Sequence, residues 1–326
     1  MDVSLFYPPL SKRMDARYKD FLSSADLRDE GDADVIALLT DDDFNVVACG
    51  ARAGHTLKQF AVSPDLEGGG ACATVLSELL NEAARAGVKR LFICTKPKNR
   101  AMFASMGFYP ITETKDAVLM EDRKNGFADY LASLPRYDGE CGAIVVNGDP
   151  FTRGHQFLCE YAAQNCDALY VFSVSEPGSM FSPEDRFEMV KAGTAHIENC
   201  HVEHTDEYLV SRETFPAYFI RDEEHADRVK ADLDIELFRK RIAPALHITK
   251  RFVGEEPFSP TTRAYNERMK ELLPECGIEL IEIPRLLSIS ASRVRMLIKE
   301  GRIEETKELV PETTYEIILR HAERNA

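Results

Sequence analysis

GAIVVNGDPFTRGHQFLCEYA, residues 142–162, decides the fold of the second half of this chain. Its apolar run Ala143–Asn147 predicts a short buried strand, and the pattern from Gly154 to Asn165 predicts a helix. Between them, the Gly-Asp-Pro sequence of residues 148–150 predicts a tight turn. The start of such a helix carries unpaired backbone N–H groups and the positive end of the helix dipole, so this loop is a candidate anion site.

Two interpretations of this loop stay open on its own residues. Gly154 has no Cβ, so a phosphate could approach the backbone closely, and His155 and the Thr152 hydroxyl could donate to phosphoryl oxygens. Alternatively, Thr152 merely caps the helix and His155 is a surface residue. In open α/β sheets the ligand crevice lies at the carboxyl ends of the strands, which is where this loop falls.

The rest of the second half alternates strand and helix patterns. Strands are expected at Ala168–Ser175, 246–253 and 278–283, and helices at 225–243, 261–273, 290–300 and after Ser182. This alternation predicts a Rossmann-like, doubly wound parallel sheet in a domain spanning residues 138–326.

A second candidate anion site lies near the C-terminus, in the sequence LSISASRVR, residues 287–295. Ser290 has the pattern of an N-cap, which places Ser292 and Arg295 three residues apart on one helical face. Hydroxyls and a guanidinium at a helix start suit an anion. A capping serine without any ligand is the simpler alternative.

The first half is expected to form a mixed α/β domain over residues 1–130. Strands are expected within 34–49, at 56–62 and at Val88–Thr95, and helices at Ala71–Ala86 and Asn99–Met106. The loop Ser63–Gly70 between them ends in three glycines. The stretch Glu121–Glu140 holds Gly, Pro and many charges, and it marks the boundary.

Composition excludes several classes of function. A net charge of −15 opposes binding to a nucleic-acid backbone. The chain has no apolar run of about 18 residues and no secretory signal pattern, so no membrane span is expected. Its eight cysteines form no CxxC pair, which favours free thiols in the cytoplasm. His201 and His204 fall in a strand pattern that turns them to opposite faces, so no metal site is expected.

The two candidate anion sites carry a resemblance. TRGH and ISASRVR resemble the paired (H/T)xGH and ISSTxxR motifs of the HIGH-type nucleotidyltransferase superfamily. Thr152 stands at the first histidine position, as in the phosphopantetheine adenylyltransferase branch, and Ala291-Ser292 replaces Ser-Thr. Together with FSVSEPGSMFSPEDRFEMVKAGTAHIENC, VSRETFPAYF and VGEEPFSPTTRAYNERM, these blocks resemble the citrate lyase ligase family over residues 140–326.

The resemblance implies a ligase reaction. ATP, acetate and the prosthetic-group thiol on the acyl-carrier subunit of citrate lyase would give AMP, pyrophosphate and a thioester. The implied catalytic contacts come from Thr152, His155, Ser290, Ser292 and Arg295. The implied nucleotide-binding residues are Asn147, Gly148, Asp149, Phe151, Gly154, Gly254 and Glu255. Mg²⁺ would bridge the phosphates without dedicated protein ligands.

Two other functions stay open. A phosphopantetheine adenylyltransferase-like enzyme shares the sequence DPFTRGH, although the extra N-terminal domain and the VGEEP block speak against it. A non-catalytic protein that senses CoA or a nucleotide is the alternative outside enzymes, and the intact phosphate motifs disfavour it.

The first half resembles the GNAT acyltransferases, in which a loop after a bulged strand holds the pyrophosphate of acyl-CoA. Residues 62–70, the following helix and the sequence NRAMFASMGFYPI carry this resemblance. Glu67 occupies the first place of the loop motif and Cys72 a small-residue place. A carboxylate beside a pyrophosphate is repulsive, which disfavours CoA binding. Acyl transfer stays open beside two alternatives, a scaffold that docks the substrate protein and a vestigial fold.

Overall fold

The structure is a computed structural model that describes residues 2–175, 179–206, 208, 218–220, 222–256, 259–284, 286 and 289–324. Residue contacts divide the chain into two units. The first comprises the described residues up to 128 and those within 212–236, and the second comprises the described residues of 129–211 and 237–326. This division differs from the expected limits, 1–130 and 138–326, by grouping 212–236 with the first unit. The expected limits stay a prediction.

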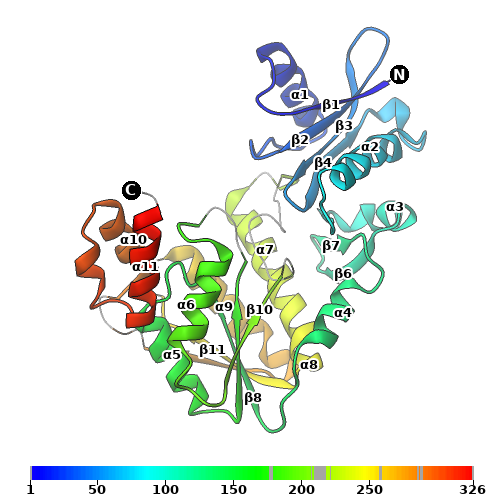
Figure 1. Ribbon diagram of the computed structural model, residues 1–326. Coiled ribbons are helices and arrows are strands. Elements are labelled where there is room, and N and C mark those ends of the chain that lie inside the picture. Colours follow the sequence, from blue (N-terminus) through cyan, green and yellow to red (C-terminus); the bar gives the residue numbers. More distant parts are fainter. Residues whose placement is uncertain are drawn as a thin grey trace. The chain divides into compact units, whose positions relative to one another are not determined.

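The first unit is built on a seven-stranded sheet of order β1-β2-β3-β4-β5-β7-β6 (Figure 1). Its strands are β1 (Asp2–Phe6), β2 (Val35–Thr40), β3 (Val46–Ala53), β4 (Thr56–Val62), β5 (Phe92–Thr95), β6 (Tyr109–Glu113) and β7 (Val118–Glu121). The β4–β5 pair is parallel and the other neighbouring pairs are antiparallel. The mixed α/β character expected of the first half is therefore confirmed.

Helices pack on both faces of this sheet. They are α1 (Lys12–Ser24), α2 (Ala71–Arg85) and α3 (Arg100–Ser105), with 3-10 turns at Pro64–Leu66 and Pro97–Asn99; α4 (Gly126–Ser133) follows β7 and spans the boundary between the two units. Residues of α2 join one hydrophobic core and residues of α1 join another. The expected strand from Val88 begins instead at Phe92, because the Val88 amide closes α2 by donating to the Ala83 carbonyl at 2.9 Å.

The second unit contains a five-stranded sheet of order β10-β9-β8-β11-β12, in which every neighbouring pair is parallel. Its strands are β8 (Cys141–Val146), β9 (Ala168–Ser173), β10 (Cys200–His204), β11 (Ile248–Gly254) and β12 (Glu279–Ile283). The first strand of this sheet in chain order is β8. It is central, and the later strands lie on both of its sides. The expected doubly wound parallel sheet is confirmed.

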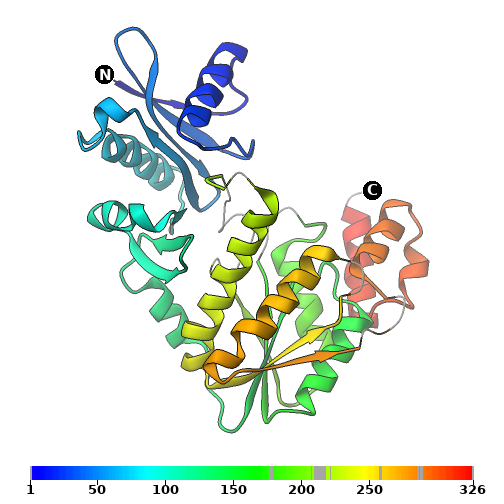
Figure 2. The same ribbon diagram turned by 180° about the vertical axis from the view of Figure 1, so that it is seen from behind.

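The helices of this part of the chain are α5 (Arg153–Ala163), α6 (Pro183–Gly193), α7 (Glu223–Leu237), α8 (Ala243–Ala245), α9 (Pro260–Leu272), α10 (Ala291–Lys299) and α11 (Glu312–Arg324). A π-helical turn at Phe238–Ile242 and 3-10 turns at Pro274–Cys276 and Ile303–Thr306 complete the elements. Helices α5 and α6 cover one face of the parallel sheet and α9 covers the other (Figures 1 and 2). Among the described helices, none has the length and apolar character needed to cross a bilayer.

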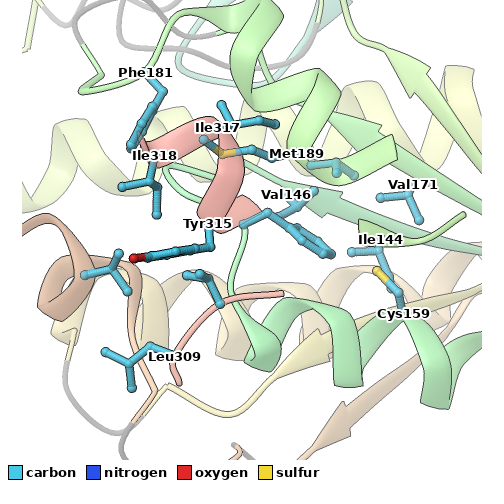
Figure 3. Close-up of a cluster of buried hydrophobic side chains, with 14 of the residues drawn as sticks. Ile144, Val146, Cys159, Val171, Phe181, Met189, Leu309, Tyr315, Ile317 and Ile318 are labelled. Atoms are coloured by element: carbon cyan, nitrogen blue, oxygen red, sulfur yellow. The ribbon is translucent and has the colours of Figure 1, made fainter. Parts of the chain in front are cut away.

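The main core of the second unit lies between the sheet, α5, α6 and α11. Figure 3 shows Ile144 and Val146 of β8 near Met189 of α6 and Ile317 and Ile318 of α11. All five side chains are at most 5% exposed. The C-terminal helix is thus part of the core that supports β8.

Candidate active site

The crevice of the parallel sheet lies between the carboxyl ends of β8 and β11. From β8 the chain passes through α5 to β9 on one side, and from β11 it passes through α9 to β12 on the other side. The two connections diverge, so the loops that follow β8 and β11 face each other across a switch point. Ligands of open α/β sheets bind at this place. Five of the seven predicted nucleotide-binding residues lie in these loops, Gly154 lies in the first turn of α5, and Gly254 is the last residue of β11.

The loop after β8 is held against α6. The buried guanidinium of Arg186 donates to the Asn147 carbonyl at 3.2 Å and also to the Asn147 side chain. Gly148 has φ +60°, and a Cβ there would lie 3.1 Å from Val190 Cγ2. The left-handed φ therefore favours glycine at this turn, and a Cβ would also need Val190 to shift slightly. Arg186 is therefore a fully buried charge that supports the loop, although it lies on a helix.

Asp149 connects three segments of the second unit. Its two carboxylate oxygens accept the backbone N–H groups of Phe181 and Met180, at 3.1 and 3.3 Å. Its backbone carbonyl accepts from Arg295, and its Oδ2 lies 3.6 Å from Nη1 of that arginine. The carboxylate is thus used inside the protein, which makes Asp149 a positioning residue for the loop.

The start of α5 is a capping box built from Thr152 and His155. The Thr152 hydroxyl accepts the His155 amide at 3.4 Å, and the Thr152 amide donates to His155 Nδ1 at 3.0 Å. An Nδ1 that accepts a hydrogen bond carries no proton, so the proton of the neutral ring is on Nε2. Thr152 is 2% exposed. Its hydroxyl therefore orients the histidine, and the expected direct phosphate contact of Thr152 is not what this geometry favours.

Phe151 fixes the plane of the same imidazole. Its ring lies 5.6 Å from that of His155, with 24° between the planes, and it is fully buried. A Cβ at Gly193 would lie 2.6 Å from this ring, so the glycine of α6 makes room for it. The structure therefore places Phe151 in the packing beneath the loop, where it orients His155 and is covered from a nucleotide.

The two predicted anion sites lie side by side. A Cβ on Gly154 would be 3.9 Å from Ile289 Cγ2, just before α10. Ser290 caps α10 as predicted, and its hydroxyl accepts the Arg293 amide at 3.1 Å. Arg295 Nη2 donates to Ser292 Oγ at 3.1 Å, which confirms that these side chains share one helical face.

Arg295 joins the second motif to the first. Its guanidinium reaches Ser292 on its own helix and the Asp149 carbonyl in the loop after β8. The starts of α5 and α10 therefore lie near each other, at the carboxyl end of β8. Leu287 and Ser288 of the quoted motif lie outside the described residues.

The end of β11 forms the other side of the crevice. The Glu255 amide donates to the Ile283 carbonyl at 2.9 Å, and Asn266 donates to the Gly254 carbonyl at 3.2 Å. Among the described residues, no atom outside its chain neighbours lies within 4 Å of a Cβ placed on Gly254. Sequence reasoning missed Asn266, because a single amide within a helix carries no local signal. Pro257, in the same loop motif, lies outside the described residues.

The histidines of β10 serve as packing residues. His201 stacks on Tyr137, with ring centroids 3.7 Å apart, and His204 stacks on Phe187 at 3.4 Å. Burial lowers the pKa of both imidazoles below the ordinary value. Within the described ranges, no group of three or more His, Cys, Asp or Glu side chains is arranged to hold a metal.

Comparison with known proteins identifies the family. A family model described as the citrate lyase ligase C-terminal domain matches residues 141–318. The chain is 41% identical to a citrate (pro-3S)-lyase ligase from Klebsiella pneumoniae, over 93% of this chain and 92% of that protein. This chain belongs to the citrate lyase ligase family. A citrate lyase ligase from Escherichia coli K12 is 37% identical over 97% of this chain and 94% of its own length.

Similarity to other classes is more local. This chain is 29% identical to a phosphopantetheine adenylyltransferase from Heliobacterium modesticaldum, over 29% of this chain and 60% of that protein. A solved acetyltransferase of the GNAT family from Staphylococcus aureus MU50 matches 37% of this chain and 98% of its own, at 10% identity and a TM-score of 0.32. The family assignment therefore rests on the matches to the citrate lyase ligases.

Proposed function

We propose that this ligase activates acetate with ATP and transfers the acetyl group to the prosthetic-group thiol on the acyl-carrier subunit of citrate lyase. Membership of the family supports ATP-dependent acetylation of citrate lyase. The observation that carries the site assignment is the link from Arg295 to Asp149, which brings the TRGH and ISASRVR segments together at the carboxyl end of β8. The eight free cysteines support a reducing, cytoplasmic location.

The phosphates of ATP are assigned to the region between the starts of α5 and α10. The positive dipole ends of both helices favour an anion there, although at the start of α5 the Arg153 N–H donates to the Leu309 carbonyl and the His155 N–H to the Thr152 hydroxyl. Gly154 presents no side chain toward that region, so its backbone can be approached closely. Gly254 and Glu255, at the end of β11, are assigned to the nucleoside part of ATP on the other side of the switch point.

His155 is assigned as the donor to the α-phosphoryl oxygen. Its Nε2 carries the proton because Nδ1 accepts the Thr152 amide. Negative charge grows on the nonbridging oxygens during attack, and a donor held in place beforehand stabilises the transition state more than the ground state. Thr152 and Phe151 act through His155, as positioning residues. Arg295, held by Ser292, supplies positive charge near the same phosphates, and Ser290 caps the helix that carries both.

The reaction takes place in two balanced steps. In the first, an acetate oxygen attacks the α-phosphorus, the bond to the bridging oxygen breaks, and pyrophosphate leaves with acetyl-adenylate formed. In the second, the thiolate attacks the acetyl carbon and AMP leaves with the electron pair of the broken C–O bond. Positioning of the carboxylate in line with the leaving oxygen supplies most of the catalysis expected of such a site.

Mg²⁺ fits this site only as an ion carried by the phosphates. Both oxygens of Asp149 already accept backbone N–H groups, and the neighbouring Arg295 is a cation. Bound Mg²⁺ would neutralise phosphate charge. The roles assigned to His155 and Arg295 do not depend on it.

Pyrophosphate exchange into ATP tests the proposal. Exchange that requires acetate supports the ligase, and exchange that requires phosphopantetheine supports the adenylyltransferase alternative. An absence of exchange with either compound, also when the carrier protein is supplied, would favour a non-catalytic nucleotide sensor. We expect acetate-dependent exchange.

A further inference from the structure

The parallel strands of the first unit, β4 and β5, stay together for two residue pairs. Thr56 pairs with Phe92 and Leu57 with Ile93. Beyond these pairs β4 continues along β3, and β5 continues along β7. The strands thus part, and their facing backbone groups are left across a gap, which we call the β4–β5 gap. Buried backbone groups of this kind require partners.

Tyr218 bridges the β4–β5 gap from a segment more than a hundred residues away in the chain. Its hydroxyl donates to the Cys94 carbonyl of β5 at 3.3 Å. Burial raises the pKa of Tyr218 above the ordinary value, and a backbone hydrogen bond from Gln59 of β4 acts in the opposite direction. The Tyr218 hydroxyl therefore forms hydrogen bonds with a backbone group of β4 and one of β5, as a peptide unit of a strand inserted between them would.

The bridge is firmly anchored on both sides. The Arg28 amide donates to the Tyr218 carbonyl at 2.9 Å, and the tyrosine is 3% exposed. Gln59 has φ +59° at the irregular part of the β3–β4 pairing, and its side chain accepts from Tyr18 at 2.9 Å. These contacts hold the phenol in the gap and fix the bulge in β4 beside it.

The loop that ends in three glycines, residues 67–70, which we call the glycine loop, follows β4 in the chain. Strand β4 leads through Pro64–Leu66 to residues 67–70 at the start of α2. Cys72 lies in the first turn of α2, directly after these residues. An arm attached to phosphates on the glycine loop would therefore run toward the phenol. Glu67 adds a negative charge to the loop, which opposes the phosphates themselves.

We propose that Tyr218 is a built-in plug that closes the β4–β5 gap to the amide-bearing thioester arm of a CoA-type ligand. The first unit then does not transfer acyl groups, and its sheet is completed by the chain's own side chain. This inference is independent of the proposed ligase function, which concerns the second unit.

Hydrogen exchange followed by mass spectrometry on the full chain tests the plug. The readout is the peptide containing Gln59–Val62, with and without about 1 mM acetyl-CoA, a concentration that detects even weak binding. In wild type and in Tyr218→Phe, which keeps the ring in the gap, acetyl-CoA leaves exchange unchanged. In Tyr218→Ala the peptide exchanges faster, and acetyl-CoA slows it again by about tenfold.

Two results would overturn the proposal. One is protection of this peptide by acetyl-CoA in wild type, and the other is a folded Tyr218→Ala variant that acetyl-CoA does not protect. Tyr218→Leu, which retains more buried apolar volume, replaces Tyr218→Ala if that variant fails to fold. Acetate-dependent pyrophosphate exchange stays unchanged in these variants, so a failed plug and a failed ligase function are told apart.

Discussion

Substitution of His155 can separate its two functions, because each ring nitrogen has its own task. Nδ1 accepts the Thr152 amide at 3.0 Å, and Nε2 carries the proton assigned to the α-phosphoryl oxygen. Asparagine offers an acceptor where Nδ1 lies and nothing where Nε2 lies. Alanine offers neither. His155→Asn is therefore expected to keep the capping box and lose the donor, whereas His155→Ala loses both.

The expected magnitudes follow from these contacts. His155→Ala loses about 0.5–1.5 kcal/mol in the free energy of unfolding, the net value of one hydrogen bond. His155→Asn stays within about 0.5 kcal/mol of wild type. In both variants acetate-dependent pyrophosphate exchange falls by about 10²–10³-fold, the loss found when one donor to a developing charge is removed.

Urea unfolding followed by circular dichroism gives the stabilities, and labelled pyrophosphate exchange into ATP gives the rates. A wild-type exchange rate in His155→Asn would refute the donor role of Nε2. Equal losses of stability in the asparagine and alanine variants would refute the acceptor role of Nδ1.

Three further predictions concern stability and the second motif. Gly148→Ala costs about 1–2 kcal/mol in urea unfolding because of its left-handed φ, and the Val190 contact adds to this cost. Gly254→Ala, whose Cβ would meet no atom of the described residues within 4 Å, stays within about 0.5 kcal/mol of wild type. Equal costs in the two variants would contradict this prediction. Arg295→Lys lowers exchange by about tenfold or more, since an ammonium lacks the planar fork that holds Ser292 and Asp149 together, and unchanged exchange would argue against the link. Burial lowers the pKa of His204 below 6.5, against the opposing effect of Asp206 and Glu184, so the unfolded chain binds the proton more readily. The stability that neutral His204 contributes is fully present above pH 6.5 and is lost as the pH falls below it. His204→Phe should lessen the loss of stability between about pH 7.5 and about pH 5.5. A loss of stability as large as in wild type would contradict the role given to His204.

Much of the second unit could be predicted from sequence, because its signals are local. The apolar run before Asn147 and the turn after it determine β8 and the start of α5. Ser182 and Ser290 cap helices that begin one residue later, as expected. Each signal depends on backbone groups within a few residues, so no knowledge of the rest of the fold was needed.

The sequence did not reveal features that depend on tertiary contacts. Helix α11 was not predicted, although Ile317 and Ile318 complete the core against α6. In the first unit β1, α1, β6, β7 and α4 were also missed, since short strands and helices acquire their stability from neighbours. The use of Arg186 to hold Asn147 could not be foreseen either, because a charged residue on a helix is ordinarily solvated.

The residues of the candidate site could be predicted from the sequence, but the hydrogen bonds that each of them makes could not. Pattern and resemblance pointed to Thr152, Ser290 and Arg295 as phosphate contacts. In the structure the hydroxyls of Thr152 and Ser290 accept capping N–H groups and Arg295 contacts Asp149, and the phosphate contacts themselves stay a prediction. Which group of a motif meets the ligand and which one orients it depends on hydrogen bonds that sequence spacing does not contain.

The most direct test of the ligase function is the intact mass of the citrate lyase acyl-carrier subunit. The deacetylated carrier, bearing its prosthetic-group thiol, is incubated with this protein, ATP, Mg²⁺ and acetate. The account predicts a mass increase of one acetyl group, with one AMP and one pyrophosphate formed for each carrier modified. A carrier of unchanged mass, under conditions in which the protein is folded and binds ATP, would contradict it.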